Sequence, residues 1–107
     1  MPREKFRTLT EQMFYVLLCL RQECCGMDIM EQVKVLTKGR VTVGPGTLYN
    51  LLEQFTDAGM IRETKAEGRR RSYVITEKGR EALEQENTRM QTMLADYHRF
   101  MKGEHAV

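Results

Sequence analysis

The chain has 107 residues, of which 41% are hydrophobic and 30% are charged. This length fits one domain with one core, since single domains usually hold about 100 to 150 residues. The sequence contains no run of about 18 to 20 consecutive apolar residues, and its start, MPREKFRT, lacks the apolar core of a signal peptide. We therefore expect a globular cytoplasmic protein with no membrane partner.

Two helices are predicted before residue 40. The pattern Thr-Leu-Thr-Glu at residues 8–11 is typical of a capping box and predicts a first helix that runs to Gly26. Its centre is apolar around most of its circumference, so it must be covered on more than one side. A second helix is predicted from about Asp28 to Lys38, ending at Gly39, with one apolar face made by Ile29, Met30, Val33 and Leu36. Residues 41–43, Val-Thr-Val, are predicted as a short extended strand.

The third predicted helix lies between two glycines. Gly44 suits the N-cap, Pro45 suits the first helical position, and Gly59 can end the helix in a left-handed conformation. Apolar residues recur at i, i+3, i+4 and i+7 and give this helix one inward face, made by Leu48, Leu51, Leu52 and Phe55.

The opposite side of this helix is polar and begins with a predicted anion site. The free N–H groups around Gly46 and Thr47 lie at the positive end of the helix dipole, where a phosphate can bind. Asn50 and Gln54 carry amides that can pair with adenine edges in a major groove. Tyr49 flanks this surface. The alternative is a short solvated surface helix, because such Pro and Gly signals occur in all helical proteins.

A basic β-hairpin is predicted next, from strand-like runs at residues 60–65 and 72–75. Lys65, Arg69, Arg70 and Arg71 less Glu67 leave a net charge of +3 in residues 65–71, whereas the whole chain carries +2. A focused positive loop beside a helix N-terminus is typical of proteins that bind nucleic acids. The alternative is a solvated charge run that protects an edge strand from aggregation.

Thr76 predicts the N-cap of a final helix over residues 77–102, about 39 Å long at ~1.5 Å per residue. Its apolar positions repeat every seven residues and form a seam, with Asn87 as the one polar member. The helix is longer than a winged helix can cover, and the apolar positions continue past that length. Burying four or five such side chains is worth roughly 1.5 to 3 kcal/mol each, so we expect a second copy to cover them. The seam contains Leu83, Asn87, Met90, Leu94, Tyr97 and Met101, widened by Met93 and Phe100.

We therefore predict a mainly α fold with a small β-hairpin. Residues 1–76 are expected to form a winged helix-turn-helix DNA-binding domain, and residues 77–107 a C-terminal dimerisation helix and tail. A two-fold dimer would read two half-sites about 34 Å apart in double-stranded DNA, so the operator should be nearly palindromic. The alternative is a helix that folds back on its own domain. The predicted interface consists of Phe14, Tyr15, Leu18, Met90, Leu94, Tyr97 and Met101.

The sequence predicts neither an enzyme nor a metal or cofactor site. His98 and His105 are the only histidines, and no nucleophile, nucleotide loop or zinc-ligand spacing accompanies them. Cys19, Cys24 and Cys25 lack a CxxC spacing and are expected to be reduced thiols. A redox role for Cys24 or Cys25 stays open, although no cation or helix N-terminus is evident beside them.

Several segments together resemble the PadR family of bacterial transcriptional regulators: LTEQMFYVLLCL, CGMDIMEQV, VGPGTLYNLLEQFTDAGMI, GRRRSYVIT and TEKGREAL. The resemblance covers residues 9 to about 94, and GPGTLY at residues 44–49 is its most specific part. It implies a winged helix-turn-helix repressor, released from DNA by a small effector. It also implies that Thr47 and Tyr49 touch the DNA backbone, that Asn50 faces a groove, and that residues 69–71 form the wing.

Two positions depart from the family pattern. Met27 replaces an aromatic residue, which affects packing, and the chain has no tryptophan, unlike members that stack flat drugs at the dimer centre. An adaptable apolar effector cavity could instead be lined by Phe14, Met90, Met93 and Tyr97. A competing interpretation is a winged helix that binds protein rather than DNA, because a fold does not fix function.

Overall fold

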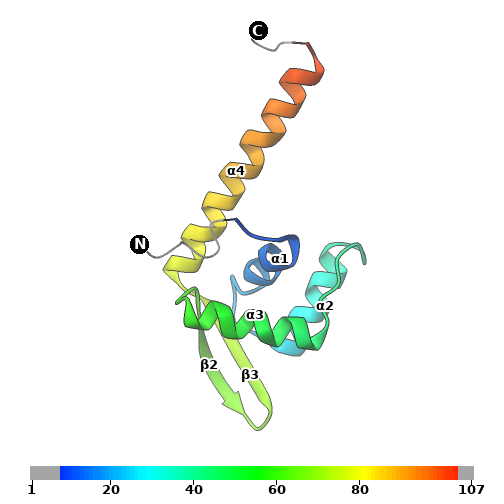
Figure 1. Cartoon of the computed structure of the whole chain (residues 1–107). Coiled ribbons are helices and arrows are strands. Elements are labelled where there is room, and N and C mark those ends of the chain that lie inside the picture. The colour runs from blue at the N-terminus through cyan, green and yellow to red at the C-terminus, as the bar shows by residue number, and fades with distance from the viewer. Residues whose placement is uncertain (1–7, 104–107) are drawn as a thin grey trace.

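The computed structural model describes residues 8–103, which form four helices and a three-stranded sheet. Figure 1 shows the earlier helices grouped together, a β-hairpin extending away from them, and a last helix that projects far beyond the other elements. This arrangement confirms the mainly helical winged-helix class. In chain order the elements are α1 (Glu11–Cys19), β1 (Cys24–Cys25), α2 (Gly26–Leu36), α3 (Pro45–Asp57), β2 (Ile61–Glu67), β3 (Arg70–Ile75) and α4 (Glu77–Met101).

The core is built from the apolar faces of α1, α2 and α3. All four residues of the predicted α3 stripe are buried, which confirms that stripe. On α2, however, Leu36 is 55% exposed, contrary to the predicted face. Helix α2 ends at Leu36, and Thr37, its C-cap, is the next residue after Ile29 and Val33 at a spacing of four. Thr37 is therefore the residue that is buried at this end of the helix. The side chains with the least exposure are Val16, Leu17, Leu20, Ile29, Val33, Leu48, Leu52 and Phe55.

Helix α1 is shorter than predicted at both ends. Thr10, not Thr8, is its N-cap and accepts from the Met13 N–H at 3.1 Å, so the predicted capping box is wrong. The helix ends at Cys19 instead of reaching Gly26. Tertiary pairing explains this end, since the Leu20 carbonyl accepts from the Ile75 N–H at 2.8 Å and the chain then enters β1.

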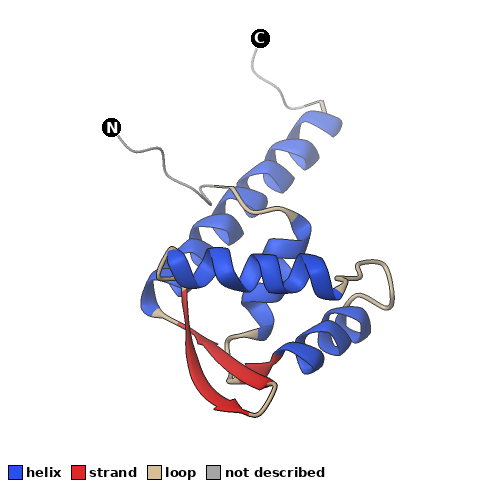
Figure 2. Ribbon diagram, turned by 60° about the horizontal axis from the view of Figure 1, so that its bottom comes forward, coloured by secondary structure: helices blue, strands red, loops and turns tan. Residues whose placement is uncertain are grey.

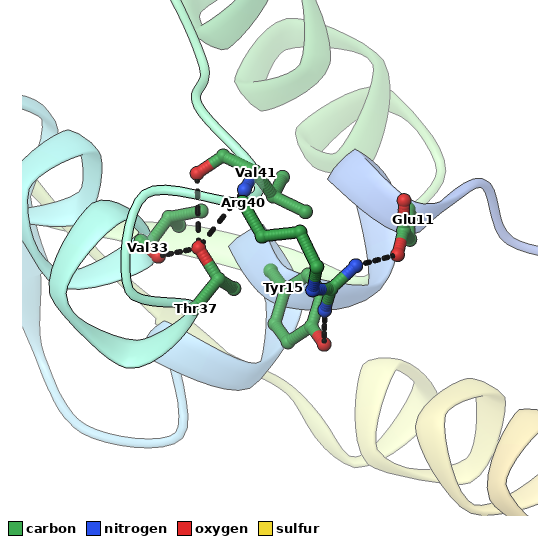
Figure 3. Close-up of polar contacts among 6 residues, drawn as sticks. All are labelled: Glu11, Tyr15, Val33, Thr37, Arg40 and Val41. Atoms are coloured by element: carbon green, nitrogen blue, oxygen red, sulfur yellow. Dashed lines mark hydrogen bonds and ion pairs between the residues drawn. The ribbon is translucent and has the colours of Figure 1, made fainter.

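The sheet has the order β1-β3-β2 and is antiparallel throughout, with Cys24 opposite Tyr73 and Cys25 opposite Ser72. Figure 2 shows the short β1 beside the start of α2. The strand predicted at residues 41–43 is not one. The Thr37 hydroxyl accepts from the Val41 N–H at 3.0 Å and also lies 3.1 Å from the Val41 carbonyl oxygen (Figure 3). These side-chain contacts replace strand pairing at Val41.

The hairpin β2–β3 is longer than predicted. Its pairing runs from Ile61 opposite Ile75 to Glu67 opposite Arg70, which leaves a two-residue loop. Gly68 in that loop has φ of 61°, a conformation that glycine adopts without steric cost. Arg70 and Arg71 therefore belong to β3, where successive side chains point to opposite faces of the sheet.

Helix α4 begins against the body and then leaves it. Thr76 caps the helix as predicted and accepts from the Gly79 N–H at 3.3 Å. A Cβ built on Gly79 would lie 2.2 Å from the Met60 carbonyl oxygen, so the helix backbone touches the body directly there. Residues 91–101 are all exposed. None of the helices within residues 8–103 has the length and apolar character needed to cross a membrane.

Candidate nucleic-acid interface

The polar face of α3 is accessible where its first turn begins. Gly44 is the N-cap, and no side chain caps the free N–H groups of the first turn. Amides at such a position, together with the helix dipole, attract an anion. Gly46, Thr47 and Asn50 are exposed on this turn and the next, whereas Gln54 is half-buried.

Tyr49 connects this face to the start of α2. Its side chain is 49% exposed. A Cβ built on Gly26 would lie 2.9 Å from the Tyr49 hydroxyl oxygen and 3.2 Å from a ring carbon, so the ring rests on bare backbone. The absence of a side chain at Gly26 therefore leaves the space that the Tyr49 ring and hydroxyl occupy.

The wing and α3 enclose a groove of about 500 Å³. Tyr49 lies on its α3 side, and Arg69 and Arg71 lie on its wing side. The groove thus brings together three of the predicted contact residues. Carboxylates also reach it, from Glu53 and Asp57 on α3 and Glu63 on β2, so the groove is lined by side chains of both charges.

The three wing arginines have different surroundings. Arg69 is exposed at the tip and has no hydrogen bond or ion pair within residues 8–103. Arg71 forms an ion pair with Glu63 at 3.5 Å. Arg70 turns the other way and donates to the Cys25 sulfur at 3.3 Å, with Asp28 4.0 Å away. Lys65 is exposed on β2.

The cysteines lie close to this surface. Burial, followed by the Asp28 carboxylate, raises the pKa of Cys24 to about 11, which keeps that thiol protonated. Burial also raises the pKa of Cys19. Cys25 is the N-cap of α2 and lies next to Arg70, so the expectation that no helix N-terminus or cation is near these thiols was wrong. Within residues 8–103, no group of His, Cys, Asp and Glu side chains could hold a metal ion.

The residues predicted for dimerisation fall into two sets. Phe14, Tyr15 and Leu18 are half-buried on α1, and Tyr15 accepts from Arg40 at 3.0 Å (Figure 3). Arg40 also pairs with Glu11 at 2.5 Å and so joins the α2–α3 turn to α1. On α4, Met90 is half-buried, whereas three residues farther along are more than half exposed: Leu94, Tyr97 and Met101.

A cavity of about 400 Å³ lies between α1 and α4. Phe14 lines it, together with Leu18 and Leu83. The other predicted effector residues, Met90, Met93 and Tyr97, are not part of its lining. Within one chain, the structure therefore brings only Phe14 of that set to this cavity.

Solved structures share this fold. A transcriptional regulator from Clostridium thermocellum superposes with a TM-score of 0.71 at 20% sequence identity, over 84% of this chain and 91% of that chain. A PadR family transcriptional regulator from Eggerthella lenta gives 0.70 at 18% identity, over 84% and 80% of the two chains. Another from Clostridium difficile gives 0.66 at 17% identity, over 83% and 97%. No curated protein matches the chain.

The transcriptional regulator PadR-like family matches residues 16–85, well over half of the sequence. This span includes α2, α3 and the whole wing, together with the last four residues of α1 and the start of α4. It therefore contains the exposed start of α3 and the wing arginines. The chain belongs to the PadR-like family of transcriptional regulators, whose members act by binding DNA.

Proposed function

We propose that this cytoplasmic protein is a homodimeric repressor that binds a near-palindromic operator and is released by a small apolar effector. One observation supports this best: Tyr49, on the exposed face of α3, and the wing residues Arg69 and Arg71 line the same groove. A phosphate backbone needs donors in this arrangement, while an adjacent helix face reads base edges. Residues 1–76 would bind DNA, and residues 77–107 would pair the two subunits.

The DNA contacts divide into positioning and reading groups. The amides of Gly46 and Thr47 would bind one phosphate, and Tyr49 would contact the backbone beside it. Lys65, Arg69 and Arg71 would bind phosphates along the wing. Asn50, exposed one turn into α3, would pair with a base, with Gln54 contributing less because it is half-buried.

The exposed end of α4 supports pairing with a second copy. Five large apolar side chains project from it with exposures of 50 to 65%: Met93, Leu94, Tyr97, Phe100 and Met101. Exposed apolar clusters of this kind mark interaction surfaces. A two-fold pairing through this seam, supported by Phe14 and Leu18 on α1, would place two copies of α3 for inverted half-sites.

Effector release needs a site where binding changes the angle between the two subunits. The cavity beside Phe14 lies between α1 and α4, and Met90, Met93 and Tyr97 would extend it once a partner helix packs there. A ligand that fits only one angle of α4 would shift the population of dimers away from the DNA-binding arrangement.

Fluorescence anisotropy with the DNA upstream of the protein's own gene tests this function. Binding should weaken steeply with salt, and log K should fall by about 0.9 per phosphate contact for each unit of log salt concentration. A wild-type protein that shows no salt-sensitive binding to this DNA or to genomic fragments would contradict the proposal. It would favour a winged helix that binds protein.

Base reading is tested with Asn50→Ala on operators changed at one position at a time. The variant should lose about 1 to 3 kcal/mol of preference at a single base pair and retain the wild-type salt dependence. Gln22→Ala removes an exposed amide between α1 and β1 and is the matched control. An equal loss on every sequence would show that Asn50 does not read a base.

A further inference from the structure

Three consecutive arginines in the wing lie on two sides of the sheet. Arg69 and Arg71 face the groove beside α3. Arg70, between them, contacts the start of α2 on the other side, 3.3 Å from the Cys25 sulfur and 4.0 Å from an Asp28 carboxylate oxygen. The alternation of a β-strand explains the difference between Arg70 and Arg71, which are neighbours in β3 and point to opposite faces, whereas Arg69 lies in the hairpin loop.

The two groups that contact Arg70 both belong to the start of α2. Cys25 is 7% exposed, pairs with Ser72 across β1 and β3, and is the N-cap of α2. Its thiol donates to Asp28 at 3.3 Å. Asp28 lies in the first turn of α2, where the helix dipole favours a negative charge. Arg70 therefore contacts the start of α2 through one buried side chain, Cys25, and one exposed carboxylate, Asp28.

The same end of α2 also supports the recognition helix. Gly26, the residue after Cys25, carries the Tyr49 ring of α3 on its bare backbone. The start of α2 thus contacts both parts of the groove: α3 through Tyr49 and the wing through Arg70. A two-stranded ribbon twists easily on its own, so a fixed contact near its tip restricts the angle between the wing and α3.

We propose that Arg70 is a positioning residue, which with Cys25 and Asp28 fixes the wing so that Arg69 and Arg71 reach the phosphates. This inference rests on the proposed DNA-binding function and assigns different roles to three adjacent arginines. A wing held in its bound geometry loses less conformational entropy on binding, which improves affinity without a further phosphate contact.

Matched alanine variants of adjacent arginines separate the two roles. Arg69→Ala should weaken operator binding and lower the slope of log K against log salt by about 0.9, as the loss of one phosphate contact requires. Arg70→Ala should weaken binding by about three- to tenfold, the effect of one exposed charge-assisted contact, and leave the slope unchanged. Thermal unfolding of both variants would show that each is folded.

Removing the Asp28 carboxylate, which faces Arg70, should change DNA affinity in opposite directions if Arg70 positions the wing and if it only contacts a phosphate. Asp28→Asn removes a negative charge, which by electrostatics alone should strengthen DNA binding slightly. A positioning role instead predicts weaker binding, with no further loss in the double variant with Arg70→Ala. Glu31→Gln, an exposed carboxylate on the same helix, is the charge-matched control and should not weaken binding.

The outcomes distinguish this inference from the proposed function. If the wild type binds DNA but Arg70→Ala lowers the salt slope as Arg69→Ala does, Arg70 is a phosphate contact and the inference is wrong. Stronger binding by Asp28→Asn would also overturn it. If the wild type shows no salt-sensitive binding, the proposed function fails first.

Discussion

The two halves of α4 have the same seven-residue apolar pattern but different surroundings. In the half nearest the body, Gly79 and Glu86 are buried and Leu83 is half-buried. In the far half, residues 91–101 are all exposed, although Leu94 and Tyr97 continue the same seam. The body of the winged helix covers the first half, and the second half extends into solvent (Figure 1).

This difference shows that periodicity identifies an apolar face but not what covers it. The near half is fitted closely to the body, with backbone contact at Gly79 and a buried carboxylate at Glu86. The far half carries large, exposed side chains of Met, Leu, Tyr and Phe, which can adapt to a second helix. Stability within one chain and association between chains should therefore respond to different substitutions.

The largest effect is expected from charges in the far half. Leu94→Lys combined with Tyr97→Lys should convert the proposed dimer into a monomer, because each lysine would be buried in the interface near the lysines of the second copy. Operator affinity should fall by about 100-fold or more with the loss of bivalent binding. Light scattering measures the mass, and anisotropy measures the affinity. Thr92→Lys lies on the other side of the helix and should remain dimeric; a dimeric seam variant would contradict the prediction.

A methyl group in the near half should destabilise the fold itself. Gly79→Ala would place a Cβ 2.2 Å from the Met60 carbonyl oxygen and 2.6 Å from the Ile75 Cγ1. Separating the helix from the body should cost about 3 kcal/mol of unfolding free energy, measured by urea denaturation at one protein concentration. Gly46→Ala, with no atom within 4 Å of its built Cβ, should not lower stability. Equal denaturation midpoints for the Gly79 variant and the wild type would refute the close contact.

The smallest effect is expected at Glu86, whose carboxylate anchors the near half. The hydrogen bond from Arg89 lowers the pKa of Glu86. Burial opposes this effect, and a hydrogen bond from the Leu9 backbone lowers the pKa further. Because the pKa of Glu86 is lower in the folded than in the unfolded protein, its ionised carboxylate stabilises the fold at pH values above the unfolded-state pKa of about 4.3. This stabilisation is lost as the pH falls through the folded-state pKa.

Glu86→Gln should therefore cost about 1 kcal/mol of unfolding free energy at pH 7. The difference between the variant and the wild type should shrink as the pH falls below about 4. Urea denaturation at a series of pH values measures it, with the exposed Glu81→Gln as the control. A difference that stays constant down to pH 3 would show that ionised Glu86 does not stabilise the fold.

The sequence predicts helix ends correctly where the determining interactions lie within a few residues of each other. Gly44 and Pro45 at the start of α3, and Gly59 after its end, predicted that helix correctly. Thr76 likewise predicted the start of α4. In each case the determining interaction is local: a fixed φ, a left-handed glycine or a side-chain cap.

A contact between distant segments produced the error at β1. Strand β1 has two residues and exists because Cys24 and Cys25 pair with β3, some fifty positions later, so no local pattern identifies it. The error at Val41 has a local cause: its neighbours are strand-like, but its backbone groups are bound by the side chain of Thr37, four residues earlier.

The roles of the wing arginines were also hidden from the sequence. Their direction depends on the register of β2 and β3, which becomes known only when the hairpin loop is placed at residues 68–69. Three like charges in a row look equivalent, and strand geometry makes them different.

The bare backbone at Gly26 has a consequence for how operator preference could diverge. Because the Tyr49 ring occupies the space of a missing side chain, a methyl at that position would displace the ring without altering any group on α3. A substitution at Gly26, at the start of α2, can thus change the position of Tyr49 on α3. A comparison limited to the residues that contact bases would not include Gly26.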